Sequence, residues 1–229
     1  MIVLILGSGP NVTQAADWQR DAFGRIVAIN NAWRVRPDWD DLIHPSDFPA
    51  DRQPNTLKQH QRIITYVDYV PAQNALGGFV YGGGTMAFTA AYWALHTLRP
   101  SLLAFMGCDM TYDAAQTHFY GTGTADPLRK DVTLRSLEAK SARIQALAAR
   151  QNCAAINLST NPSRLVFPRG TPLDLMARPE LNETAVDHAL RLEQDAGYMV
   201  PSGKYWKEES RFDTDVIDAI DAAWLATIA

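Results

Sequence analysis

Cysteine, long apolar runs and surplus positive charge are scarce in this chain of 229 residues, and each scarcity excludes a class of protein. Two cysteines, Cys108 and Cys153, are too few for a disulfide framework or a cysteine-based zinc site. No stretch approaches the roughly 20 consecutive apolar residues of a membrane span. The net charge of −4 lacks the cationic excess that neutralises a phosphate backbone, so we expect no nucleic-acid partner.

The remaining composition is that of an ordinary globular protein, with 47% hydrophobic and 20% charged residues. A chain of this length can bury roughly 70% of the surface that its unfolded state exposes, which is enough for one large core. The first residues are apolar at once, without the basic lead-in or cleavage site of a signal peptide. We therefore expect a cytoplasmic protein whose cysteines stay reduced.

Short apolar runs alternate with helical segments through residues 1–160. The longer runs predict strands buried on both faces of a parallel sheet, at Ile2–Leu6, Arg25–Ile29, Leu102–Met106 and Ala154–Leu158, with shorter strands at Leu42–Ile43 and Ile63–Tyr66. Helices are predicted between them at Thr13–Arg20, Met86–Leu98 and Thr133–Arg150. This alternation predicts an α/β fold, a Rossmann-like open, mostly parallel sheet with helices on both faces.

Residues 161–229 differ from this pattern. Helices are predicted at Glu180–Gln194 and Asp213–Ile228, the second with apolar residues at helical spacing. We expect a C-terminal loop and helical cap packed on the domain of residues 1–160. The segment Tyr198–Trp206 is aromatic enough to line a pocket, with a packed loop as the alternative.

Small and polar residues follow the predicted strands, where open α/β sheets bind their ligands. These clusters are Gly7–Asn11, Asn30–Asn31, His44–Asp47 and Gly107–Asp109, to which the turn Gly82–Thr85 adds a glycine-rich helix start. A helix N-terminus directs N–H groups and a positive dipole end at an anion, so we expect a nucleotide phosphate there. A turn in which Thr85 merely caps the helix is the alternative.

The sequence does not match two well-known nucleotide-binding motifs, the dinucleotide-binding fingerprint and the Walker-type loop. Val12 stands where the third glycine of G-x-G-x-x-G is expected, and Asn30–Asn31 stands where an NAD site has an acidic residue for the ribose. No G-K-[ST] tripeptide follows the Gly82–Gly84 run, which excludes a Walker-type loop. A nicotinamide dehydrogenase is therefore disfavoured.

The loop that follows Asp109 is rich in side chains that could carry chemistry. It contains Tyr112, His118 and Tyr120. A histidine can accept a proton near neutral pH, and tyrosine hydroxyls can donate hydrogen bonds to phosphate oxygens. His118 is thus a candidate general base, with a structural histidine as the alternative. Asp109 either belongs to the site or caps the loop, whereas Cys108 is predicted to be a small buried hydrophobe.

Together these segments resemble a known family. The turn Gly7–Asn11, Asn30, His44–Ser46, Gly83–Thr85 and the run Leu103–Asp109 are similar in order and rough spacing to the bacterial sialyltransferases of glycosyltransferase family 42. The resemblance covers about residues 1–160. More distantly, the opening strand and Gly-x-Gly-Pro turn resemble the 6-hydroxymethylpterin diphosphokinase-like proteins. Both resemblances imply a Rossmann-like fold that binds a nucleotide.

The sialyltransferase resemblance also implies residue roles. It places the donor nucleotide near Ser8, Asn30, His44 and Gly84, and the leaving phosphate near Tyr112. Position after a strand or before a helix adds the nucleotide-binding candidates Gly7, Gly9, Gly83, Thr85 and Asp109, and Tyr120 is a further candidate to assist departure of the phosphate. Ser8, His44 and Gly84 replace an Asn, an Asn and a Ser of the family. The family's catalytic histidine falls at Thr122 rather than at His118, so a catalytic His118 requires a shifted loop.

Three functions remain open at this point. The first is metal-independent transfer of a sialic-acid-like sugar from a CMP-sugar to a small molecule or glycan, with no cofactor. The second is ATP-dependent diphosphate transfer, in which Asp47 or Asp109 would anchor Mg²⁺. The third is a non-catalytic nucleotide-binding protein. The oligomeric state is also open, with a homo-oligomer as one outcome.

Overall fold

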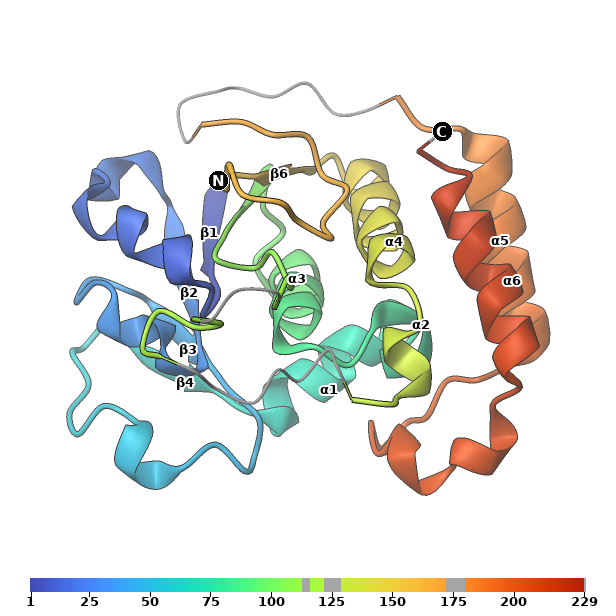
Figure 1. The fold of residues 1–229 in the computed structure, drawn as a ribbon, viewed down its shortest axis with the longest axis horizontal. Coiled ribbons are helices and arrows are strands. Elements are labelled where there is room, and N and C mark those ends of the chain that lie inside the picture. The colour runs from blue at the N-terminus through green and yellow to red at the C-terminus, as the bar shows by residue number, and fades with distance from the viewer. Residues whose placement is uncertain (113–115, 122–128, 172–179, 229) are drawn as a thin grey trace.

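A computed structural model describes residues 1–112, 116–121, 129–171 and 180–228 (Figure 1). Six strands form one parallel sheet in the order β4-β3-β2-β1-β5-β6. They are β1 (Ile2–Leu6), β2 (Arg25–Ile29), β3 (Asp41–Ile43), β4 (Arg62–Ile64), β5 (Leu102–Met106) and β6 (Ala154–Asn157). The predicted Rossmann-like α/β sheet is confirmed. The strand order reverses between β1 and β5, which are neighbours in the sheet.

The central strands are buried on both faces, as their continuous apolar runs predict. Successive side chains of a strand point to opposite faces. Val3 and Ile5 therefore belong to one hydrophobic core, and Leu4 and Leu6 belong to the other. All four side chains are fully buried. A sheet of this kind is stable only when both faces are covered.

Alpha-helices cover the face that carries Val3 and Ile5. They are α1 (Tyr66–Asn74), α2 (Phe79–Gly82), α3 (Met86–Thr97) and α4 (Leu137–Arg150). The sequence did not predict α1, because Pro71 lies inside it and an interior proline normally signals the end of a helix. Since Tyr66 already belongs to α1, the strand predicted at Ile63–Tyr66 ends at Ile64.

The opposite face is covered by 3-10 helices, at Pro10–Asp17, Arg20–Ala22 and Asn30–Arg34. The helix predicted at Thr13–Arg20 is therefore wrong in type and bounds. Val12 and Ala15 are its buried core residues, three positions apart, which suits a helix with three residues per turn. The helix predicted from Thr133 is also shorter than expected. A 3-10 turn, Val132–Leu134, precedes Ser136, which caps α4.

The C-terminal residues form α5 (Glu183–Ala196) and α6 (Thr214–Leu225), with 3-10 turns at Tyr205–Lys207 and Glu209–Arg211. The two helices lie side by side, and α6 packs on α4, away from the strands (Figure 1). Buried ion pairs fasten them to α4: Arg143 Nε lies 2.7 Å from Glu193, and Lys140 Nζ lies 2.6 Å from Asp221. Among the described residues, no helix has the length and apolar character needed to cross a membrane.

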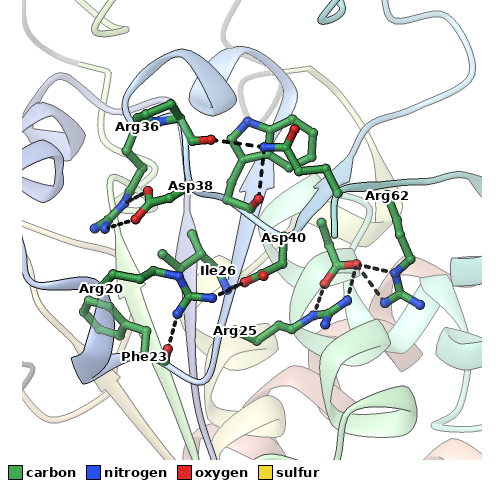
Figure 2. Close-up of polar contacts among 12 residues, drawn as sticks. Arg20, Phe23, Arg25, Ile26, Arg36, Asp38, Asp40 and Arg62 are labelled. Atoms are coloured by element: carbon green, nitrogen blue, oxygen red, sulfur yellow. Dashed lines mark hydrogen bonds and ion pairs between the residues drawn. The ribbon is translucent and has the colours of Figure 1, made fainter. Parts of the chain in front are cut away.

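A network of arginines and aspartates ties together the first residues of β2, β3 and β4 (Figure 2). Asp41 is fully buried and accepts hydrogen bonds from Arg25 at 2.7 Å and from Arg62 at 2.8 Å. Asp40 accepts from the backbone of Ile26 at 2.7 Å and from Arg20 at 2.9 Å. The network lies at the amino ends of these strands, opposite the end where parallel sheets bind ligands. Its role is structural.

Replacing Asp41 tests that role. We expect Asp41→Ala to lower the free energy of unfolding by about 3 kcal/mol, because two guanidinium groups lose the same buried acceptor. Asp218→Ala removes the exposed pair with Arg135 and should cost less than about 1 kcal/mol. Urea denaturation of both variants is the measurement. Equal losses would contradict the structural importance of Asp41.

Candidate functional site

A cleft of about 1700 Å³ opens at the carboxyl ends of β1, β2 and β5. It therefore lies where the strand order reverses, which is the usual ligand site of open α/β sheets. The structure brings most of the predicted site residues to its wall: Gly7, Ser8, Gly9, Asn30, Gly84, Thr85, Asp109, Tyr112, His118 and Tyr120. Residues distant in the sequence thus share one concave surface.

Two predicted nucleotide-binding residues, His44 and Gly83, are not among the residues that line this cleft. The buried His44 ring packs on Phe48 with ring centroids 5.1 Å apart, and its Nδ1 lies 2.9 Å from the Pro45 carbonyl oxygen. Gly83 has a φ of +88°, and a Cβ there would lie 2.6 Å from the Phe88 ring. Backbone conformation and packing thus explain this glycine without a ligand.

The turns after β1 and β5 pass each other in close contact. Gly7 N–H donates to the Met106 carbonyl at 2.8 Å, and Gly9 N–H donates to the Gly107 carbonyl at 2.8 Å. A Cβ on Gly7 would collide with the Gly107 carbonyl oxygen. The glycine at position 7 is therefore required by the crossing itself, and these two amides are not free to bind phosphate.

In the glycine-rich turn before α3, other residues of the chain also take up the Gly84 amide and the space beside Gly84. Gly84 N–H donates to Thr133 Oγ1 at 3.1 Å, and a Cβ on Gly84 would lie 2.5 Å from the Tyr205 hydroxyl. A bulky residue at Gly84 would disturb this wall whether or not a phosphate binds nearby. Thr85 caps α3 by accepting from Phe88 N–H at 3.3 Å, which was the alternative role considered for it. The first N–H groups of a helix have no intrahelical acceptor, and Met86 and Ala87 at the start of α3 line the cleft.

Asp131 joins the C-terminal extension to this turn. Its carboxylate accepts hydrogen bonds from Tyr205 Oη at 2.8 Å, Thr133 Oγ1 at 2.6 Å and Arg129 Nε at 2.9 Å. Desolvation alone would raise the pKa of Asp131, but the hydrogen bonds from Thr133 and Tyr205 and the charge of Arg129 outweigh it and leave the pKa below its ordinary value. The segment Tyr198–Trp206 thus contributes a cleft wall, through residues 202–206.

The buried carboxylate of Asp109 links three segments at the base of the cleft through hydrogen bonds. Its Oδ2 accepts from Asn11 Nδ2 at 2.9 Å and Ser159 Oγ at 2.6 Å, and its Oδ1 accepts from Asn157 Nδ2 at 3.2 Å. The turn after β1 and the ends of β5 and β6 therefore meet at one buried carboxylate. A residue so engaged does not fit the role of a Mg²⁺ ligand, and within the described ranges no three His, Cys, Asp or Glu side chains cluster as a metal site would need.

The loop that carries His118 is bonded to the turn after β1. Phe119 N–H donates to the Ser8 carbonyl at 3.0 Å. The His118 ring lies 5.1 Å from the Tyr120 ring and 6.1 Å from the Tyr112 ring, and its Nδ1 lies 2.9 Å from Thr117 Oγ1. Desolvation lowers the pKa of His118 below its ordinary value of 6.5, which favours the neutral form of the ring. Thr122 lies outside the described residues.

Several charged residues line the cleft. Arg34, Arg52, Arg129 and Asp131 were not found by sequence reasoning, whereas Asp47 and Lys204 belong to two segments that it singled out, His44–Asp47 and Tyr198–Trp206. Asp109 and Asp131 are engaged as described above. Arg34, Arg52 and Lys204 have no ion-pair partner in the part of the chain that the structure describes. Uncommitted positive charge in a cleft of an acidic protein favours an anionic ligand.

Exposed aromatic side chains also gather at this cleft. Tyr66, Tyr120 and Trp206 are the aromatic residues among the exposed large apolar side chains of the described chain, and all three line it. Their exposed fractions are 57%, 42% and 57%. Exposed rings of this kind offer flat faces on which a base or a sugar ring can stack.

The lowered pKa of Asp131 predicts a pH dependence. The unfolded chain binds a proton near the ordinary value of 3.8, above the folded-state pKa, so the stability that Asp131 contributes is present above that value and is lost as the pH falls through the folded-state pKa. We expect Asp131→Asn to cost about 2 kcal/mol at pH 7 and progressively less below pH 4. Urea denaturation from pH 7 to pH 3, with the exposed Asp51→Asn as control, measures this. A difference that stays constant over that range would contradict the assignment.

Comparisons with known proteins find no match for the chain: no protein family, no curated protein and no solved structure is similar enough to report. The resemblance to the bacterial sialyltransferases therefore stays a prediction, and a function can be inferred only from the residues of the cleft itself.

Proposed function

We propose that the chain binds a nucleotide or nucleotide-sugar in this cleft and transfers the sugar to an acceptor without a metal. The observation that carries the proposal is the hydrogen bond between Phe119 N–H and the Ser8 carbonyl. It fixes the candidate base, His118, beside the turn where a Rossmann-like sheet binds its ligand. The proposed base and the proposed binding turn would therefore belong to one site.

The phosphate would lie at the start of α3. The N–H groups of Met86 and Ala87 and the positive end of the helix dipole favour an anion there. Arg129 lies beside this position, because its Nη2 donates to the Gly84 carbonyl at 3.3 Å. These groups support phosphate binding through the helix start rather than through the glycine amides that the sequence suggested.

In the proposed reaction, an acceptor hydroxyl attacks the anomeric carbon of the sugar. His118 takes the hydroxyl proton, for which Nε2 is the available ring atom when Nδ1 pairs with Thr117. A new bond forms between the acceptor oxygen and the anomeric carbon. The bond from that carbon to the phosphate oxygen breaks, and CMP departs with its electron pair. Hydrogen bonds from the hydroxyls of Tyr112 and Tyr120 would stabilise the departing phosphate.

The alternatives differ in what they need from the same cleft. ATP-dependent diphosphate transfer needs carboxylates for Mg²⁺, and the oxygens of Asp109 are already engaged by three side chains. A non-catalytic nucleotide-binding protein would need the binding groups alone. We propose a cytoplasmic location, which agrees with the free, buried state of Cys108 and Cys153. Burial raises the pKa of both thiols, for Cys153 to about 12, so neither is a ready nucleophile.

Thermal unfolding with added nucleotides tests the proposal. A ligand at a hundred times its Kd contributes about 2.7 kcal/mol, which for a chain of this size raises Tm by roughly 5–10 °C. We expect such a rise with CMP, without added metal. A rise with ATP and Mg²⁺ but not with CMP would favour diphosphate transfer. No rise with any of these nucleotides would overturn the proposal.

Replacing His118 tests the catalytic part. We expect His118→Ala to lower kcat by about two orders of magnitude while the Kd for CMP stays within about twofold. Because burial lowers the pKa of His118, the acidic limb of the wild-type pH–rate profile should have its midpoint below 6.5. His188→Ala, on the exposed face of α5, is the matched control. Undiminished turnover in His118→Ala would remove the histidine from the mechanism.

A further inference from the structure

Two arginines that line the cleft have no acidic partner. Most arginines in the described part of the chain form an ion pair with an aspartate or a glutamate. Arg34 and Arg52 are exposed on the cleft, and neither guanidinium group has a hydrogen-bond or ion-pair partner within the described ranges. A guanidinium group is a fork of N–H donors that matches the oxygens of a carboxylate or a phosphate. Two such forks on a ligand-sized cleft therefore favour an anionic group on the ligand.

The two arginines come from turns that are joined to each other. Trp33, next to Arg34 in the 3-10 helix after β2, donates from its indole Nε1 to the Arg52 carbonyl at 3.0 Å. The guanidinium carbon of Arg34 lies 5.3 Å from the centre of the Trp33 ring, a cation–π contact. Arg36 shows the contrast, because its side chain is buried and bonded to Asp38 at 2.6 Å. The chain thus fixes these turns through other residues and leaves Arg34 and Arg52 exposed.

These turns and the start of α3 belong to opposite faces of the sheet. Trp33 and Phe119 pack against one hydrophobic core, whereas α3 contributes to the other. Because Phe119 directly follows His118, the loop of the candidate base lies on the same face of the sheet as Arg34. The proposed phosphate position and the arginines are therefore on different sides of the sheet edge.

Three aspartates also line the cleft, but none of them forms an ion pair with these arginines in the part of the chain that the structure describes. Asp109 and Asp131 accept hydrogen bonds from the side chains given above. Asp47 lies close to Tyr69 in α1, because burial and, to a lesser extent, the charge of Asp47 raise the pKa of Tyr69. The positive charge of the arginines thus stays available to a ligand.

We infer that Arg34 and Arg52 hold an anionic group of the acceptor, a carboxylate or a phosphate, across the sheet edge from the phosphate of the nucleotide. The inference rests on the proposed function and names the class of acceptor, a hydroxyl compound that carries negative charge. The cleft of about 1700 Å³ exceeds the roughly 300–1,000 Å³ of a site for one small molecule, so it has room for two substrates. With its charge at the arginines, the acceptor would lie on the side of the sheet from which His118 approaches.

Three probes that differ in charge test the inference. Glucose, glucuronate and glucose 6-phosphate all offer hydroxyl groups, and only the last two carry an anionic group. Their Kd values are measured by NMR titration, without CMP and with CMP at about a hundred times its Kd. With CMP bound, we expect glucuronate or glucose 6-phosphate to bind at least about tenfold more tightly than glucose. The tighter of the two anions identifies a carboxylate or a phosphate as the group.

Glutamine variants assign this preference to the arginines. In the double variant Arg34→Gln/Arg52→Gln we expect the ratio of the Kd values of glucose and the tighter anion to fall to within about threefold of one. The Kd values of glucose and CMP should stay within about twofold of the wild-type values. Arg191→Gln is the matched control, because Arg191 is exposed on α5, has no ion pair among the described residues and does not line the cleft. It should keep the wild-type ratio.

Equal binding of all three probes by the wild-type chain would overturn the inference. A preference that persists in the double variant, or that Arg191→Gln also abolishes, would overturn it as well. Anions that compete with CMP would show that the arginines hold the phosphate of the nucleotide, which overturns the acceptor assignment and leaves nucleotide binding intact. Failure of CMP to bind would instead contradict the proposed function, and the titrations without CMP would still show whether the two arginines hold an anion.

Discussion

The close crossing of the turns after β1 and β5 is the constraint on which the rest of the site depends. The two strands pair along their whole length, and a glycine follows each of them where the chain turns away. Gly7 has no room for a side chain, and Gly107 has a φ of +72° and would place a Cβ 2.7 Å from Val12. The crossing uses the amides of Gly7 and Gly9 internally. In the proposed function, ligand contacts would therefore come from what surrounds the crossing, namely the start of α3 and the loop that contains His118.

The C-terminal extension also helps to fix the shape of the cleft. Tyr205 donates to Asp131, Thr133 donates to Asp131 and accepts from Gly84 N–H, and the glycine turn before α3 is held in place as a result. The helices that follow are fastened to α4 by ion pairs whose charges are nearly inaccessible to water. Breaking one partner of such a pair is strongly destabilising, because it leaves a buried charge without compensation. The shape of the cleft therefore depends on the packing of the C-terminal extension against α4.

The sequence predicted the sheet well because strands buried on both faces appear as uninterrupted apolar runs, which Ile2–Leu6 and Leu102–Met106 illustrate. It predicted the connection after β1 poorly. Apolar residues three positions apart over only two turns suit an α-helix and a 3-10 helix almost equally. Pro71 concealed α1 for the reason given above. At the site, residues that follow strands were found by position alone. Arg129 and Asp131 were missed because isolated polar residues in loops have no periodicity, and only folding brings them to Gly84. Tyr205 lies in the segment Tyr198–Trp206, which was expected to line a pocket, but its contact with Asp131 could not be foreseen.

The distribution of donors around the cleft favours one place for the phosphate of the proposed nucleotide. The start of α3 offers N–H groups without an intrahelical acceptor and the positive end of a helix dipole, and Arg129 lies beside it, because its Nη2 donates to the Gly84 carbonyl. The turn after β1 offers no comparable donors from Gly7 and Gly9, since both amides are bonded to residues at the end of β5. A phosphate is therefore favoured at the start of α3 rather than at the first glycine turn. The candidate base, His118, belongs to a loop that is bonded to Ser8. In the proposed reaction the base and the phosphate site would thus come from separate segments that only the fold brings to one cleft.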